Sequence, residues 1–168
     1  NELMLRQMMY TALQQESPSV LRYPRGAGEG TEWQGVPFEA VEVGRGECLR
    51  EGKDIAILAV GTMANVALRA AERSTKSVAV YDLRYVKPLD EALILDVARR
   101  FKHIITIEDG ILRGGVGESI AALIARNSLS PKITTLGIDD SFVEHGKPAE
   151  LYADCGYDED ALLRVIEN

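Results

Sequence analysis

The apolar positions of the chain follow two periods that alternate from about residue 54 to residue 138. Short continuous apolar runs, typical of strands buried on both faces of a sheet, are followed by stretches of helical period. We expect strands at 54–60, 77–83, 103–109 and 132–138, with helices between them at 61–74, 89–101 and 116–127. Strands that alternate with helices are typical of βαβ units, so the pattern predicts a mostly parallel sheet between two helical layers.

Residues 36–60 read as two strands joined at Glu51-Gly52-Lys53. Three residues are too few for a crossover between parallel strands, so we expect the two strands to be antiparallel neighbours, with one edge strand running backwards. The fold class predicted is a three-layer α/β domain with a sheet of about five strands. Two short helices should close the chain, at 148–156 and 158–168, the first opened by Pro148 and the second capped by Asp158.

The N-terminal residues have a different organisation. Residues 1–14 carry apolar side chains at helical spacing, with Asn1 available as a cap, and 19–23 read as a short strand before a glycine-rich stretch. We expect a boundary near residue 35, with a helix, a strand and a linker at 1–35 and the α/β domain at 36–168. A helix that starts at the first residue, which is not Met, suggests that the chain is part of a longer polypeptide.

Composition and charge narrow the classes of function. The 168 residues are 46% hydrophobic and 27% charged, and 19 basic against 26 acidic residues give a net charge of −7. An acidic chain repels nucleic acid and anionic membranes, so neither is expected as a partner. Cys48 and Cys155 lie far apart and suit free thiols in a reducing compartment. Without a signal peptide or a spanning apolar run, we expect a cytoplasmic location.

Ligands of open α/β sheets bind beyond the carboxyl ends of the strands, which directs attention to three loops. The first follows the strand at 77–83, where Asp82 and Arg84 could bind a ligand or tie the strand to its loop. We favour the internal tie, because paired charges at strand ends are commonly structural.

The second loop contains Glu108, Asp109 and the glycines Gly114, Gly115 and Gly117 ahead of a helix. A glycine-flanked helix N-terminus can hold phosphate, but the spacing matches neither the P-loop nor the dinucleotide fingerprint. Close packing of helix on sheet explains the glycines without a ligand, and we favour it. Glu108 and Asp109 are adjacent on a strand, so they should face opposite sides and cannot act as an acid–base pair.

The two histidines do not suggest a metal site. His103 starts a predicted strand and His145 lies in a loop, and neither has a second histidine at ligand spacing. We therefore expect no metal ligands in this chain.

The third loop is the "RYPRG" stretch at 22–26. In an extended backbone Arg22 and Arg25 face opposite ways, so they should not share a partner. Pro24 ends the strand and Gly26 allows a bend, which places Arg25 just beyond a carboxyl end. Its guanidinium is a forked donor suited to phosphate or carboxylate, and the alternative is a salt bridge across the domain boundary.

Four stretches together resemble a known family. "NELMLRQMMYTAL", "RYPRG", "YDLRYVKPLDEAL" and "GGVGESIAAL" are similar, in this order, to the last part of the 1-deoxy-D-xylulose-5-phosphate synthases, thiamine-diphosphate enzymes of the transketolase superfamily. The likeness covers essentially the whole chain. The β subunits of 2-oxoacid dehydrogenases share the last two patterns, but "LRQMMYTAL" together with "RYPRG" favours the synthases.

The resemblance implies that 1–35 ends a pyrimidine-binding domain and that 36–168 is the C-terminal domain of a homodimer. It implies a condensation of pyruvate with glyceraldehyde 3-phosphate, dependent on thiamine diphosphate and Mg²⁺ bound elsewhere in the longer protein. The second arginine of "RYPRG", here Arg25, resembles a residue that binds the phosphate of glyceraldehyde 3-phosphate.

The chain also departs from the family's cofactor signature. It lacks the Gly-Asp-Gly motif with a downstream Asn, and its "EDG" at 108–110 stands in a different context, so Glu108 is not the family's catalytic glutamate. We expect no catalytic residue, no cofactor ligand and no activity in this chain alone. The alternatives are the C-terminal domain of a 2-oxoacid dehydrogenase β subunit and a non-catalytic interaction or anion-binding module.

Overall fold

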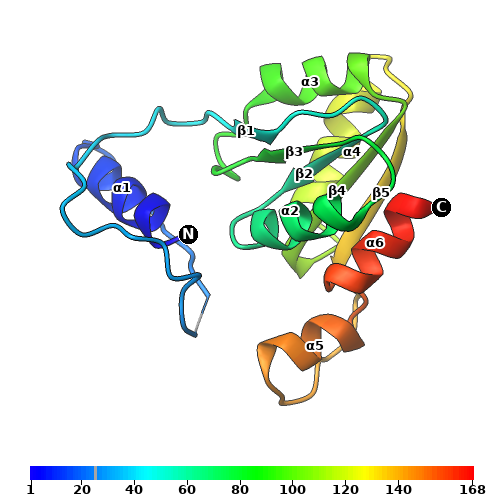
Figure 1. Cartoon of the computed structure of the whole chain (residues 1–168). Helices are drawn as coiled ribbons and strands as arrows, with labels where there is room; N and C mark the ends of the chain where they lie inside the picture. The colour runs from blue at the N-terminus through cyan, green and yellow to red at the C-terminus, as the bar shows by residue number, and fades with distance from the viewer. Residues whose placement is uncertain (25) are drawn as a thin grey trace.

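The structure, a computed structural model, describes residues 1–24 and 26–168 (Figure 1). The strands are β1 (Glu47–Arg50), β2 (Ile55–Ala59), β3 (Val78–Asp82), β4 (His103–Ile111) and β5 (Lys132–Ile138). The helices are α1 (Glu2–Leu13), α2 (Met63–Arg73), α3 (Glu91–Arg100), α4 (Val116–Arg126), α5 (Pro148–Asp154) and α6 (Glu159–Glu167).

The five strands form one sheet in the order β1-β3-β2-β4-β5. β3, β2, β4 and β5 run parallel, and β1 lies antiparallel to β3 at the edge. The helices α2, α3 and α4 make the crossovers that parallel strands require. The predicted α/β class, the strand number and the reversed edge strand are confirmed.

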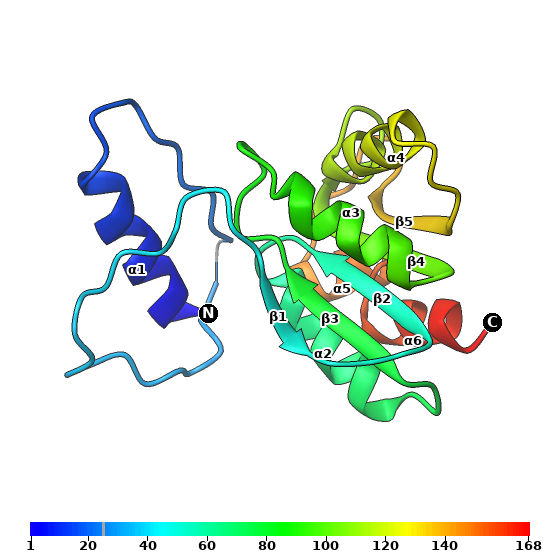
Figure 2. The same cartoon turned by 90° about the horizontal axis from the view of Figure 1, so that it is seen from above.

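Helices cover both faces of this sheet, with α2 and α6 on one side and α3 and α4 on the other (Figure 2). All five residues of β2 are buried. Ile55 and Ile57 pack toward α2, whereas Ala56 and Leu58 pack toward α3 and α4. Burying one large aliphatic side chain stabilises a fold by about 1.5–3 kcal/mol, so this strand joins two apolar cores. Burial on both faces explains its continuous apolar sequence.

The predicted neighbour of β1 was wrong. β1 pairs with β3 and not with β2. The residues that connect β1 to β2 pass close to the start of β3 before they enter β2. The backbone N–H groups of Lys53 and Asp54 donate to the Ser77 carbonyl at 3.0 and 2.8 Å. A Cβ on Gly52 would lie 2.2 Å from the Ala79 nitrogen, so only glycine allows this close passage.

β1 is also shorter and less regular than the sequence suggested. Residues 39–46 form no strand, and the ladder with β3 begins at Glu47. The register shifts between Cys48 and Arg50, which marks a bulge in this four-residue edge strand.

The strand predicted at 19–23 is absent: residues 19–24 form no strand. A strand is defined by ladder hydrogen bonds to a neighbour, and none of the five strands pairs with these residues in the sheet. The apolar pattern at 19–23 therefore does not form a strand, because no other strand pairs with it.

The predicted first helix is confirmed, including its cap: the Asn1 Oδ1 accepts from the Met4 N–H at 2.9 Å. α1 lies apart from the sheet, and residues 30–41 run along it (Figures 1 and 2). Its buried residues are polar. Gln7 bonds Pro37 and Glu39, and the Thr11 hydroxyl accepts from the Val41 N–H. Leu13 on the apolar stripe is 82% exposed.

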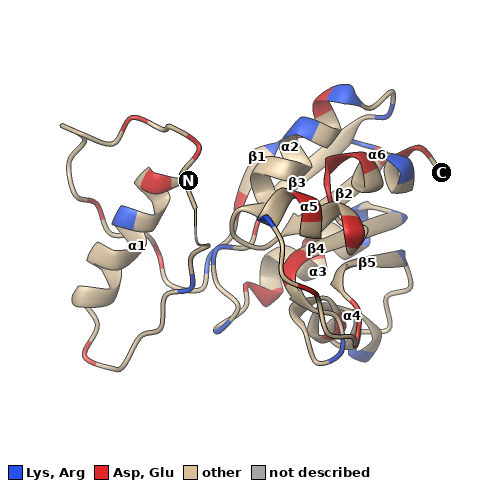
Figure 3. Cartoon of the chain, turned by 90° about the horizontal axis from the view of Figure 1, so that it is seen from below, with Lys and Arg blue, Asp and Glu red and all other residues tan. Residues whose placement is uncertain are grey.

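Acidic and basic residues are interspersed over the α/β part of the molecule (Figure 3). Within the part of the chain that the structure describes, no helix combines the length and apolar character needed to cross a membrane.

The last helix is tied to the turn after α2 by one carboxylate. Glu167 accepts from the Ser74 hydroxyl at 2.6 Å, the Thr75 hydroxyl at 2.7 Å and the Thr75 N–H at 2.9 Å. These hydrogen bonds favour the charged form and lower the pKa of Glu167 to about 2. The carboxylate therefore stabilises the fold above its unfolded pKa, near 4.5, and loses this effect as the pH falls toward 2.

Glu167→Gln is expected to lower the unfolding midpoint in urea at pH 7, because it removes the charged acceptor. The difference from the wild type should shrink between pH 5 and pH 2, a window estimated as roughly the span between the two pKa values. Glu72→Gln, an exposed change on α2, serves as the matched control. A difference that does not depend on pH would contradict this assignment.

Candidate functional site at the carboxyl edge of the sheet

A hollow lies at the carboxyl edge of the parallel strands, between the loop after β3 and the start of α4. Its volume is about 310 Å³, and the residues that line it are Val86, Leu89, Glu108, Ile111, Gly114, Gly115, Val116 and Ser119. The hollow therefore joins two of the three loops to which the sequence pointed. Its position is where ligands bind in open α/β sheets.

Glu108 provides the charge at this hollow. The residue is 7% exposed, and its carboxylate accepts from the backbone N–H groups of Val116 at 3.1 Å and Gly117 at 2.8 Å. These donors are the unpaired N–H groups of the first turn of α4, where the helix dipole favours an anion. The chain's own carboxylate thus takes the place that a phosphate would need.

The glycines around α4 serve packing. A Cβ on Gly115 would lie 2.3 Å from the Ile111 carbonyl oxygen, and one on Gly117 would lie 2.6 Å from the Thr106 hydroxyl. Gly114 has a φ of +74°, a conformation that favours glycine. The interpretation of these glycines as sites of close helix–sheet contact is supported for Gly115 and Gly117, whereas Gly114 serves the turn.

Asp82 and Arg84 do not pair with each other through their side chains. The Asp82 Oδ1 accepts from the Arg84 N–H at 2.9 Å, and the Arg84 guanidinium forms an ion pair with Glu47 of β1. Burial raises the pKa of Asp82, and the Arg84 N–H opposes this effect. The predicted internal tie exists, but it joins the loop after β3 to the edge strand.

Asp109 faces the opposite side of β4 from Glu108, as predicted. Its carboxylate accepts from the Tyr157 hydroxyl at 3.0 Å and the Tyr152 hydroxyl at 3.4 Å. Burial, together with the neighbouring Asp109 charge, raises the pKa of both phenols, so they remain protonated donors. Asp109 is therefore an anion held in place by two neutral hydroxyls.

Arg22 is the cation that approaches this anion. Its Nη2 donates to the Asp109 carbonyl oxygen at 2.6 Å and lies 3.5 Å from the carboxylate. Arg25, the predicted phosphate-binding residue, lies outside the described residues. The structure thus gives Arg22 a partner at the carboxyl edge and leaves the role of Arg25 a prediction.

The predicted histidines lie apart from this site. The His103 Nε2 is 2.9 Å from the Thr134 hydroxyl, and burial with two nearby lysines lowers the pKa of the imidazole. His145 is exposed in the loop after β5. Among residues 1–24 and 26–168, no group of three or more His, Cys, Asp or Glu side chains is arranged to hold a metal ion.

The described residues do not fit a thiamine diphosphate–Mg²⁺ site. Of the "EDG" residues, Glu108 is bonded to the α4 N–H groups and Asp109 to two tyrosines, so neither carboxylate is free to ligate Mg²⁺. No step of cofactor chemistry is therefore assigned to the side chains of this chain.

Sequence reasoning missed the partners of both carboxylates. The two tyrosines lie more than forty positions after Asp109, in a region where the sequence predicted only short helices. The role of Glu108 depends on the turn after β4, which brings α4 back over the strand. The one local signal for this site was that adjacent strand residues point to opposite faces of the sheet. It correctly predicted that Glu108 and Asp109 lie on opposite sides.

Comparison with known proteins gives the context of this site. The model of the transketolase C-terminal domain matches residues 44–162. The 1-deoxy-D-xylulose-5-phosphate synthase of Bacteroides thetaiotaomicron is 47% identical over 99% of this chain, and that of Phocaeicola vulgatus is 45% identical over 99%. The chain spans about a quarter of the length of these curated relatives, 26% and 27%. The resemblance found in the sequence motifs is confirmed.

A solved structure shares the fold. The split-gene transketolase described as an inactive β4 tetramer superposes with a TM-score of 0.70 and 28% identity. The match covers 84% of this chain and 45% of that one. The likeness supports the assignment of the three-layer fold to a transketolase-type C-terminal domain.

Glu108→Ala is expected to reduce the free energy of unfolding by ~1–3 kcal/mol, because it leaves two N–H groups at the start of α4 without their acceptor. Formate or inorganic phosphate should restore part of this loss by entering the vacated space, and neither should stabilise the wild type as much. Urea unfolding with and without each anion measures the effect.

The matched control for this change is Ser119→Ala, an exposed change in the same helix turn, which should alter stability little. Equal stability of Glu108→Ala and wild type would show that the carboxylate does not hold α4.

Proposed function

Because the chain belongs to the transketolase C-terminal domain family, we propose that it forms the C-terminal part of a 1-deoxy-D-xylulose-5-phosphate synthase. The complete protein would condense pyruvate with glyceraldehyde 3-phosphate, with loss of CO₂, to give a precursor for isoprenoid, thiamine and pyridoxal synthesis. The resemblance further implies a cytoplasmic homodimer.

The extent of the matches is the observation that carries this proposal. The domain model begins at residue 44, yet the synthases named above match 99% of the chain and therefore also match α1 and the segment after it. The synthase of Azoarcus sp. does so at 41% identity over 96% of the chain. A 2-oxoacid dehydrogenase β subunit would explain the α/β domain but not the N-terminal likeness.

The proposal assigns cofactor chemistry to the domains upstream. Thiamine diphosphate, when bound there with Mg²⁺, acts as an electron sink for the decarboxylated pyruvate. The observed engagement of Glu108 and Asp109 within this chain supports that division. In this proposal, the chain itself binds and orients the substrate at the carboxyl edge of the sheet.

In this proposal Arg25 binds the phosphate of glyceraldehyde 3-phosphate. The assignment comes from the likeness of "RYPRG" to the synthases, and the position of Arg22 at the end of β4 supports it, because the same segment reaches the edge where ligands bind. A guanidinium can hold a phosphate through two hydrogen bonds. Such a remote contact orients the aldehyde carbon for attack.

In the complete protein, Arg25→Ala should raise the KM for glyceraldehyde 3-phosphate by about tenfold or more, since it removes a charge-assisted contact. The KM for pyruvate should hardly change, because pyruvate carries no phosphate. Steady-state kinetics with each substrate varied in turn measures the split. Equal effects on both substrates would indicate a folding role for Arg25.

This chain by itself is expected to have no synthase activity, and it should gain activity only when joined to the upstream domains. The split-gene transketolase named above is likewise described as inactive in its β4 form. A product assay on the chain alone and on the joined protein provides the test. A separate titration with phosphate esters tests the alternative of an anion-binding module, which requires binding tighter than about millimolar.

A further inference from the structure

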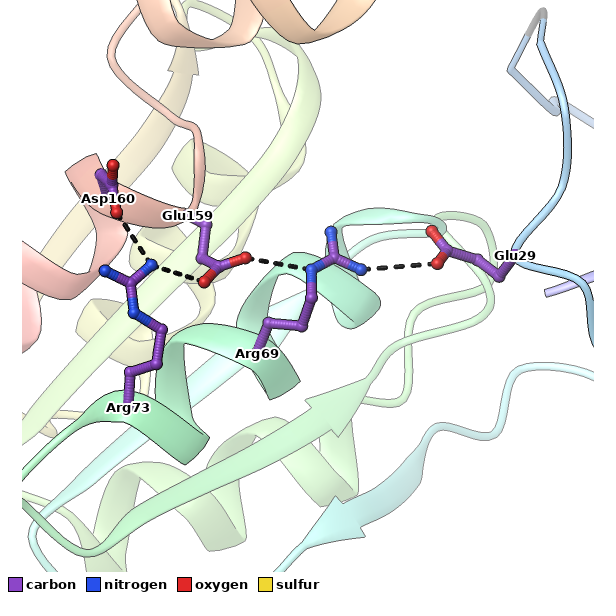
Figure 4. Close-up of polar contacts among 5 residues, drawn as sticks. All are labelled: Glu29, Arg69, Arg73, Glu159 and Asp160. Carbon is purple, nitrogen blue, oxygen red and sulfur yellow. Dashed lines mark hydrogen bonds and ion pairs between the residues drawn. The ribbon is translucent and has the colours of Figure 1, made fainter.

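Two contacts attach the segment from Arg22 to Glu29 to the α/β part of the molecule. At one end Arg22 contacts Asp109 on β4. At the other end Glu29 lies 3.4 Å from the Arg69 Nη1 on α2 (Figure 4). Arg22 is therefore attached near the end of β4, and Glu29 is attached to α2.

The second contact is part of a chain of ion pairs. The Arg69 Nε lies 3.1 Å from Glu159 on α6, and the Arg73 Nη1 lies 2.6 Å from the same carboxylate and 2.8 Å from Asp160 (Figure 4). Bridging by Glu159 fixes the Arg69 guanidinium between two carboxylates. An ion pair within such a network loses less side-chain entropy than an isolated pair, because its side chains are already held by their other partners.

Both attachments converge on the start of α6. Tyr157 holds Asp109, which contacts Arg22, and Glu159 holds Arg69, which contacts Glu29. The residue between them, Asp158, caps α6 by accepting from the Ala161 N–H at 2.8 Å. Tyr157 is 2% exposed, so this junction is built into the core and does not lie loosely on the surface.

The segment is also held on its far side. The Glu2 Oε1 on α1 accepts from the Gly30 N–H at 2.8 Å, and a Cβ on Gly28 would collide with the same side chain. Hydrogen bonds from its own backbone N–H and from the Gly30 N–H lower the pKa of Glu2. Residues 28–30 thus lie between α1 and α2.

We infer that Asp109, Arg69 and Glu159 are positioning residues, which hold Arg22 and Glu29, on either side of position 25, against the α/β part of the molecule. The consequence for phosphate binding rests on the proposed function, since that segment contains position 25. The anchoring itself rests only on the contacts of Arg22 and Glu29. The start of α6 would then set where the substrate's phosphate is bound.

The test uses the complete protein with Arg22→Gln, Arg69→Gln and the double variant. Both side chains are largely solvent-exposed, at 72% and 47%, so these changes should not prevent folding. Asp96→Asn, which removes an exposed ion pair with Arg100 on α3, is the matched control. Asp109→Asn and Asp109→Glu test the carboxylate that the two tyrosines hold. Asp109→Glu keeps the charge and is expected to retain more of the anchoring of Arg22 than Asp109→Asn.

Hydrogen exchange of peptides from 19–34 reports on anchoring without reference to activity. The double variant should exchange faster there than the wild type and the Asp96→Asn control. High salt should reduce the difference between Arg69→Gln and wild type, because salt screens exposed ion pairs. In kinetics, each single change should raise the KM for glyceraldehyde 3-phosphate about two- to fivefold, with the KM for pyruvate unchanged.

Unchanged exchange in the double variant would overturn the inference, whatever the activity. Faster exchange with an unchanged KM for the phosphorylated substrate would overturn the positioning role. Faster exchange in a complete protein whose wild type makes no product would refute the proposed function and still support the anchoring.

Discussion

The burial of β2 on both faces is the constraint on which the rest of the structure depends. Its five residues lie between two helical layers and are all apolar, and most residues of β3 and β4 are buried as well. Charged groups are consequently excluded from the middle of the sheet. They gather at the carboxyl ends of the strands, which is where the carboxylates of Asp82, Glu108 and Asp109 lie.

At that edge each of these charges already has a partner within the chain. Glu108 holds the start of α4, Asp82 accepts from the Arg84 N–H, and Asp109 is held by tyrosines that follow β5. Such an edge is rigid and shaped before any ligand arrives, which suits a domain that orients a substrate whose chemistry occurs elsewhere. The 310 Å³ hollow beside Glu108 is lined mostly by apolar side chains and glycine.

The sequence predicted what depends on local pattern. Strands buried on both faces and the caps at Asn1 and Asp158 have short-range signals, and the structure confirms them. It could not predict the partner of β1, which is decided by hydrogen bonds from the connecting loop to Ser77. Nor could it pair Arg22 with Asp109 of β4, 87 positions apart, because no periodicity encodes a contact between a loop and a distant strand.

The bulge in β1 has a consequence for the molecule in solution. An edge strand offers unpaired backbone groups to any other extended chain, and a long flat edge invites stacking into aggregates. β1 has only four residues, is kinked between Cys48 and Arg50, and carries Glu47 at its start. These features make the free edge of β1 a poor template for a sixth strand from a neighbouring molecule.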